Sequence, residues 1–163
     1  MKLKHCLFIL GLFFSAVLSA QDTKDYVPVG FDVCGIELGQ KLPHSEFVAK
    51  FGTPDKYRSY ETEFGLDEEY DYGHDNFHCE EGGHISRYSL FDSRFAVLTK
   101  YMKGGIRVGD NLEKMSAYKH GKMCYQKTYD DGREVYMLSE TDETFILVVK
   151  NYVIVSIHCA YSV

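Results

Sequence analysis

One stretch of the sequence, residues 74–84, gathers side chains that could do chemistry. It reads His74-Asp-Asn-Phe-His78-Cys-Glu-Glu-Gly-Gly-His84 and holds three histidines, one cysteine and three carboxylates. Imidazole, thiolate and carboxylate groups are the ligands that zinc takes in proteins. On a β-hairpin, His78 and Glu80 would share one face and His84 would return opposite them. The stretch is therefore a candidate metal site built from His74, His78 and His84.

The same stretch also has the composition of an ordinary turn between two strands. Glu80-Glu-Gly-Gly83 is typical of a hairpin connection, and the flanking residues would then be half-exposed strand positions. The histidine spacing matches no standard zinc set. We therefore expect no metal and no cofactor. A small extracytoplasmic hydrolase, metal-dependent or acid–base, that uses the His74–His84 cluster remains the alternative function.

A second feature is the acidic run at residues 61–81, which carries nine acidic side chains and no Lys or Arg. Paired carboxylates such as Glu68 and Glu69 could act as general acid and base. A charge run is more often a solvated face, and it can also steer a basic partner toward the protein. Two tyrosines stand inside the run, and tyrosine is common at binding hot spots. The predicted binding surface consists of Asp67, Glu68, Glu69, Tyr70, Asp71 and Tyr72.

Three common catalytic motifs are absent from the sequence. There is no serine-nucleophile elbow, no phosphate-binding loop and no His-Glu-x-x-His motif. His158 and Cys159 are adjacent, but neighbours on a strand point to opposite faces and cannot form a nucleophile–base pair. The sequence therefore favours a protein that is not an enzyme and that binds another protein, or acts in an inhibitor-like way, through its surface.

Residues 1–20 have the pattern of a secretory signal peptide: a short basic start, an apolar core and a small-residue exit ending at Ala20. We expect export to the periplasm or out of the cell, with no membrane anchor after cleavage. The formal net charge of −6 becomes −8 when Lys2 and Lys4 leave with the signal. An acidic chain without a basic run is a poor nucleic-acid binder, so the expected partner is another protein, and a basic one would suit the charge.

Four cysteines remain after the signal is removed, which in an exported protein indicates two disulfides. Three pairings are possible, and the sequence does not choose among them. The preferred pairing places one bridge in each half of the chain, Cys34–Cys79 and Cys124–Cys159. The alternative is that these cysteines are buried free thiols.

These residues must be positioned by the rest of the chain, which repeats itself. Cys34-Gly-Ile-Glu-Leu-Gly-Gln40 is echoed by Gly104-Gly-Ile-Arg-Val-Gly-Asp110, and later landmarks keep the same spacing between the two copies. Each copy continues with a short helical pattern and then with segments of period two. In the second copy, Asp110 and Glu113 form a predicted capping box. Turn signals separate the segments: Phe64-Gly65, Glu81-Gly-Gly83, Asp130-Asp-Gly132 and Lys150-Asn151.

The predicted fold class is therefore α+β, with two tandem repeats that each pack a short helix on an antiparallel β-meander. An extended lead would cover residues 21–33. The first repeat would then span 34–103 and the second 104–163.

The pattern Leu38-Gly39, then Val48, then Phe51-Gly52-Thr-Pro54 resembles the short helix motif of the SmpA/OmlA outer-membrane lipoprotein family. A secreted tandem copy of that unit, bearing cysteines, resembles the β-lactamase inhibitor protein (BLIP-like) fold. The resemblance implies a non-enzymatic, extracytoplasmic, protein-binding class whose sheet presents a surface. The chain lacks the lipid-attachment cysteine that SmpA/OmlA proteins usually carry near the signal.

Overall fold

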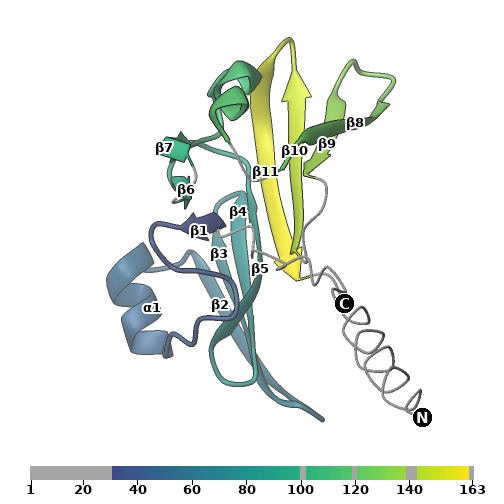
Figure 1. Ribbon diagram of the computed structural model, residues 1–163. Helices are drawn as coiled ribbons and strands as arrows, with labels where there is room; N and C mark the ends of the chain where they lie inside the picture. Colours follow the sequence, from purple (N-terminus) through teal and green to yellow (C-terminus); the bar gives the residue numbers. More distant parts are fainter. Residues whose placement is uncertain (1–30, 100–101, 119–120, 139–142, 162–163) are drawn as a thin grey trace, which may run out of the picture.

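The computed structural model describes residues 31–99, 102–118, 121–138 and 143–161 (Figure 1). The predicted signal peptide at 1–20 and most of the extended lead at 21–33 lie outside the described residues. Among the described residues, no helix is long and apolar enough to span a membrane.

The described residues form two helices and eleven strands. The helices are the α-helix α1 (His44–Phe51) and the 3₁₀ helix η1 (Leu112–Ala117). The strands are β1 (Phe31–Val33), β2 (Lys56–Thr62), β3 (Gly65–Tyr72), β4 (Asp75–Glu80), β5 (His84–Leu90), β6 (Val97–Thr99), β7 (Met102–Ile106), β8 (Met123–Thr128), β9 (Glu134–Leu138), β10 (Glu143–Lys150) and β11 (Val153–Tyr161).

The predicted α+β class is wrong, because the described chain is mostly strand and forms two antiparallel sheets. The second predicted helix is only a 3₁₀ helix of six residues. Its cap also differs from the prediction. Asn111, not Asp110, accepts the Glu113 N–H at 2.8 Å, while Asp110 Oδ2 accepts from Arg107 N and Lys114 Nζ.

The larger sheet has eight strands in the order β2-β3-β4-β5-β11-β10-β9-β8. It consists of one meander, β2–β5, and a second meander, β8–β11, which join along β5 and β11. At the join, Ser89 stands opposite His158. All eight strands are antiparallel to their neighbours, so the two meanders form one continuous surface rather than two separate units.

The loops that lead into α1 and η1 are tied to the sheet by the same backbone hydrogen bonds. In each, three bonds join the loop to the start of β5 or of β11, or to the turn before it, and the matching positions are 69 or 70 residues apart in the sequence. In the loop before α1 the bonds are Gly39 N to Ile85 O, Leu42 N to Gly83 O and Ile85 N to Gln40 O. In the loop before η1 the matching bonds are Gly109 N to Ile154 O, Leu112 N to Tyr152 O and Ile154 N to Asp110 O. The boundary predicted between residues 103 and 104 lies inside β7.

The smaller sheet has the strand order β1-β6-β7 and lies with α1 and η1 along one side of the large sheet (Figure 1). The core lies between these elements and the large sheet. Phe47 of α1 is fully buried and stacks on Tyr70 of β3, with ring centroids 3.9 Å apart. The same ring meets Phe77 of β4 edge-on at 5.5 Å, so α1 is fixed to the first meander by aromatic packing.

The preferred disulfide pairing is also wrong for this structure, in which all four described cysteines are free thiols. Cys124 lies on β8 and Cys159 on β11, with β9 and β10 between them. Three strand spacings separate these positions by about 14 Å, whereas a disulfide needs Cα atoms within about 7 Å. Cys34 lies in the turn after β1, where its N–H bonds to Ala96 O, and Cys79 is buried in β4.

Candidate functional site

Strand β3 divides the predicted binding surface between two faces of the sheet. Along this strand the residues alternate, so that Glu68, Tyr70 and Tyr72 are 4%, 0% and 1% exposed. These three point into the core beneath α1 and cannot contact a partner, which corrects the prediction for them. The partly exposed ones, Asp67, Glu69 and Asp71, lie on the opposite face, which we call the open face.

Glu68 and Tyr70 stabilise the fold through buried polar contacts instead. Glu68 accepts hydrogen bonds from the Tyr57 hydroxyl at 2.6 Å and the Tyr70 hydroxyl at 3.1 Å. His44 Nδ1 lies 3.1 Å from the Tyr70 hydroxyl and 4.0 Å from Glu68 Oε1. Burial, followed by the nearby Glu68 carboxylate, raises the pKa of Tyr70. We call Glu68, Tyr57, Tyr70 and His44 the Glu68 cluster; it joins the start of α1 to β2 and β3.

The candidate metal site is not assembled. His74 lies in the turn before β4, His78 in the middle of β4, and His84 at the start of β5 opposite Glu80. His74 and the Glu80–His84 pair stand at opposite ends of the hairpin, about 20 Å apart along the strand. His84 Nδ1 lies 2.9 Å from the Gly39 carbonyl. Within the described part of the chain, no group of three or more His, Cys, Asp and Glu side chains could hold a metal ion.

His78 is instead the buried centre of a polar network on the open face. Its Nδ1 lies 2.9 Å from Ser86 Oγ and 3.4 Å from Glu80 Oε1. Its Nε2 lies 3.3 Å from the Tyr60 hydroxyl and 4.0 Å from Asp67 Oδ2. Both ring nitrogens therefore have partners, so the imidazole fixes the positions of its neighbours. This arrangement connects β2, β3, β4 and β5 side by side.

Beyond His78 the open face carries a line of ion pairs. Arg58 of β2 lies 2.9 Å from Glu69 Oε2 and 3.5 Å from Asp71 Oδ2. Arg87 stands opposite His78 on β5. The pairs neutralise part of the charge in the middle of the face, so the uncompensated negative charge gathers toward one end.

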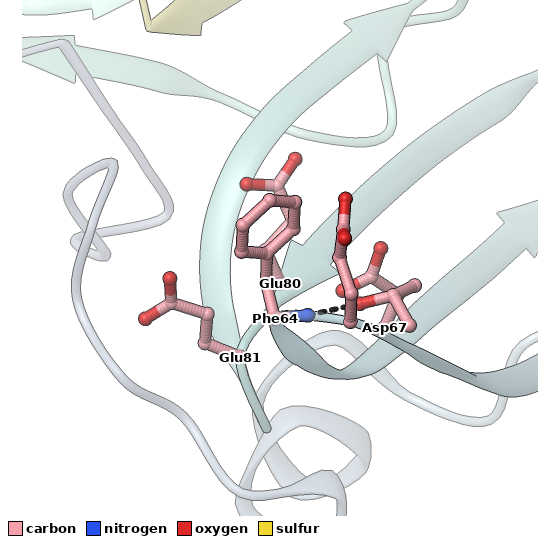
Figure 2. A pocket seen from close by; sticks show the side chains of 6 residues that line it. Phe64, Asp67, Glu80 and Glu81 are labelled. Carbon is pink, nitrogen blue, oxygen red and sulfur yellow. Dashed lines mark hydrogen bonds between the residues drawn. The ribbon is translucent and has the colours of Figure 1, made fainter.

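That end of the first meander forms the candidate site. The β2–β3 turn and the β4–β5 turn lie side by side there, because Gly82 N donates to Leu66 O at 2.7 Å. Between them is an open cavity of about 610 Å³. Figure 2 shows four of the side chains that line it: Phe64 of the β2–β3 turn, Asp67 of β3, Glu80 at the end of β4 and Glu81 in the turn that follows. We call the residues that line it the acidic rim: Thr62, Glu63, Phe64, Asp67, Glu80 and Glu81.

The acidic rim combines four carboxylates with one large apolar ring. Phe64 is 74% exposed, and its position is set by the turn, where Phe64 N donates to Thr62 Oγ1 at 3.2 Å. Lys41 approaches the neighbouring turn with its Nζ beside Gly82 but is not among the lining side chains. An exposed aromatic ring surrounded by carboxylates can contact the alkyl stem of a Lys or Arg while the acids bind its charge.

Sequence reasoning found Asp67 but missed the rest of the acidic rim. Glu63, Glu80 and Glu81 belong to the acidic run, yet nothing in their local pattern shows that two turns meet. The signal that could have found them is Phe64. Phe64 stands directly before Gly65, between carboxylates and inside a predicted turn. A phenylalanine at such a position is expected to be exposed and not part of the core.

No protein-family model matches the chain, and no curated protein matches it. Two solved structures are similar to it in part. One is a DUF4309 family protein (YjgB) from Bacillus subtilis, with 11% identity and a TM-score of 0.42, over 78% of this chain and 83% of that one. The other is a cysteine-rich secretory protein (SAV1118) from Staphylococcus aureus, with 12% identity and a TM-score of 0.46, over 85% of this chain and 48% of that one. Likenesses at this level give the chain no family and no function.

Proposed function

We propose that this chain is an exported, non-enzymatic protein-binding module that holds a basic segment of another protein at the acidic rim. The observation that carries the proposal is Phe64, which stands 74% exposed among four carboxylates. An aromatic ring exposed to this extent offers a partner a large apolar area to bury, and aromatic residues are common at binding hot spots. The ring of carboxylates selects a cationic partner, and it increases the rate of encounter with one.

The chemistry of the open face supports binding rather than catalysis. His78 has partners at both ring nitrogens, and Ser86 donates its hydroxyl to the His78 carbonyl at 3.2 Å. The hollow beside His78 has a volume of about 210 Å³, which is below the range of about 300–1,000 Å³ that is usual for ligand pockets. The resemblance to the β-lactamase inhibitor protein extends the proposal to an inhibitor-like role, in which the partner is an exported enzyme. Export rests on the signal pattern at residues 1–20.

The test compares two charge changes of equal size on the mature chain. Glu80→Gln with Glu81→Gln removes two charges from the acidic rim, and Glu113→Gln with Asp130→Asn removes two exposed charges from the other half. Each protein is immobilised and exposed to a lysine- and arginine-rich peptide and to its glutamate counterpart. We expect the basic peptide to bind the wild type and the distant variant, to bind the rim variant at least tenfold more weakly, and to dissociate in high salt.

Phe64→Ala provides the second readout. It leaves every charge in place but removes the ring, and we expect a loss of binding comparable to that of the rim variant. Equal binding by all variants would overturn the proposal. Hydrolytic turnover that disappears in His78→Ala while the fold persists would favour the hydrolase alternative.

A further inference from the structure

The two edges of the eight-stranded sheet differ in how they are protected. Strand β2 is one edge and β8 the other. The pairing of β8 with β9 is broken by an irregularity between Tyr125 and Lys127, a common protection of sheet edges. The pairing of β2 with β3 continues without a shift from Lys56 to Thr62. Every residue of β2 is exposed except the last, which is intermediate. A long, regular, exposed edge is a template for another strand.

Alternate residues of β2 direct their backbone N–H and C=O groups away from β3, toward the open edge of the sheet. Asp71 O accepts from Asp55 N, on the β2 side of β3, whereas Leu66 O accepts from Gly82 N, on the β4 side. Since backbone groups alternate along a strand, residues 65, 67, 69 and 71 bond to β2 through their partners 62, 60, 58 and 56. The N–H and C=O groups of Tyr57, Ser59 and Glu61 therefore point away from the sheet.

The charges beside this edge favour a basic strand. The β2–β3 hairpin, residues 56–72, carries six carboxylates and two cations. One of the cations, Arg58, is already paired with Glu69 and Asp71. Tyr57 and Tyr60 are 40% and 42% exposed on opposite faces of β2, and each can cover alternate side chains of a neighbouring strand. The edge also ends at Phe64 and the acidic rim.

We propose that an extended basic segment of the partner protein adds to β2 as a ninth strand of the large sheet. This inference rests on the proposed function and specifies how the partner binds. Its backbone would pair with Tyr57, Ser59 and Glu61, while its Lys or Arg side chains would reach the acidic rim. Main-chain pairing gives affinity in such strand addition, and alternate side chains give specificity.

The experiment uses the mature chain and one synthetic heptapeptide that alternates Arg or Lys with Val. A second peptide with the same side chains carries N-methyl groups on alternate residues and cannot pair as a strand. Ser59→Pro removes one outward N–H from the edge, where proline is tolerated, and Ser59→Ala changes the side chain alone. We expect at least tenfold weaker binding for Ser59→Pro and for the N-methylated peptide, with Ser59→Ala unchanged. Circular dichroism confirms that each variant is folded.

The outcomes separate this inference from the proposed function. If Ser59→Pro and the N-methylated peptide bind as well as their controls while Glu80→Gln with Glu81→Gln does not, the acidic rim stands and strand addition is wrong. If Ser59→Pro fails to fold, the N-methylated peptide decides alone. A wild type that binds neither peptide at millimolar concentration refutes the inference. So does a wild type whose edge is occupied by a second copy, seen as a dimer that Ser59→Pro dissociates.

Discussion

The Glu68 cluster should stabilise the fold through two hydrogen bonds to a buried carboxylate. Glu68 is 4% exposed and accepts from two tyrosine hydroxyls, so each Tyr→Phe change removes a hydrogen bond to a buried carboxylate. Such bonds contribute about 1.5–3 kcal/mol. Tyr70→Phe should lower the free energy of unfolding by an amount in the middle of that range, because Tyr70 is fully buried. Tyr57→Phe should lie at its lower end, because water can reach the half-exposed Tyr57 and replace the hydroxyl.

The double variant should lose more than the sum of the single ones. Without both hydroxyls, the partner that remains for Glu68 among the described residues is His44 at 4.0 Å, and an uncompensated buried carboxylate costs about 3–5 kcal/mol. We expect a coupling free energy of at least about 0.5 kcal/mol between Tyr57 and Tyr70. The measurement is urea unfolding of the four proteins at pH 7, followed by circular dichroism. Glu68→Gln is the control background, in which each Tyr→Phe change should cost only about 1 kcal/mol.

The same cluster predicts how stability responds to alkaline pH. Burial, with Glu68 second, raises the pKa of Tyr70 above its ordinary value of 10. Above pH 10 the unfolded chain loses this proton and the folded chain keeps it, so the free energy of unfolding falls as pH rises. Tyr70→Phe should reduce that slope.

A Tyr70→Phe variant as stable as the wild type at pH 7, with an unchanged alkaline slope, would refute the structural role. If the same variant also lost affinity for the basic peptide, Tyr70 would belong to a binding surface after all.

Three further changes test other parts of the structure. Gly83→Ala should destabilise the fold by about 2 kcal/mol or more, because φ is +116° and a Cβ would lie 2.7 Å from Leu42 O; a smaller loss in thermal melts would mean that this loop can shift. Asp75→Ala should lower the free energy of unfolding in urea by about 2–3 kcal/mol more than Asp75→Asn does. Asp75 Oδ1 accepts hydrogen bonds from the backbone N–H groups of Phe91 and Asp92, and Asn keeps an oxygen for them whereas Ala does not. Burial and nearby carboxylates raise the pKa of the Cys79 thiol to about 12. In the folded protein an alkylating reagent should therefore label Cys124 first, and Cys79 only after unfolding. Four cysteines that resist the reagent even in denaturant would restore the disulfide prediction.

Local signals in the sequence located the turns but not the balance of helix and strand. Phe64-Gly65, Glu81-Gly-Gly83, Asp130-Asp-Gly132 and Lys150-Asn151 all fall in or beside the connections between paired strands. Turn chemistry is local, so a sequence reveals it directly. The prediction of a second α-helix was wrong, because a short apolar pattern with a cap does not distinguish an α-helix from a short 3₁₀ helix.

The candidate site could be predicted only in part, for a similar reason. Alternation along β3 was visible, but the sequence does not say which alternate set enters the core. Glu68 shares its face with Tyr70 and Tyr72, so a carboxylate is buried with two aromatic residues. A carboxylate at such a position is predicted to be exposed from the sequence alone, unless its hydrogen-bond partners are known. The partners of Glu68 are Tyr57 of β2 and His44 at the start of α1. Contacts of that kind depend on register, which a single sequence does not give.

The join between the two meanders, β5 against β11, has an approximate two-fold symmetry. Ser89 and His158 face each other across β5 and β11, and they are as far apart in the sequence as Ile85 and Ile154, which make the matching loop hydrogen bonds. Ser89 and His158 stand at the centre, and on either side the pairs are exchanged, with Leu90 opposite Ile157 and Tyr88 opposite Cys159. This exchange is the geometry of an isologous interface between two protomers related by a two-fold axis. The join therefore resembles a two-fold interface contained within one polypeptide. Covalent linkage removes the symmetry requirement, and so one outer edge can be guarded by a bulge while the other stays regular.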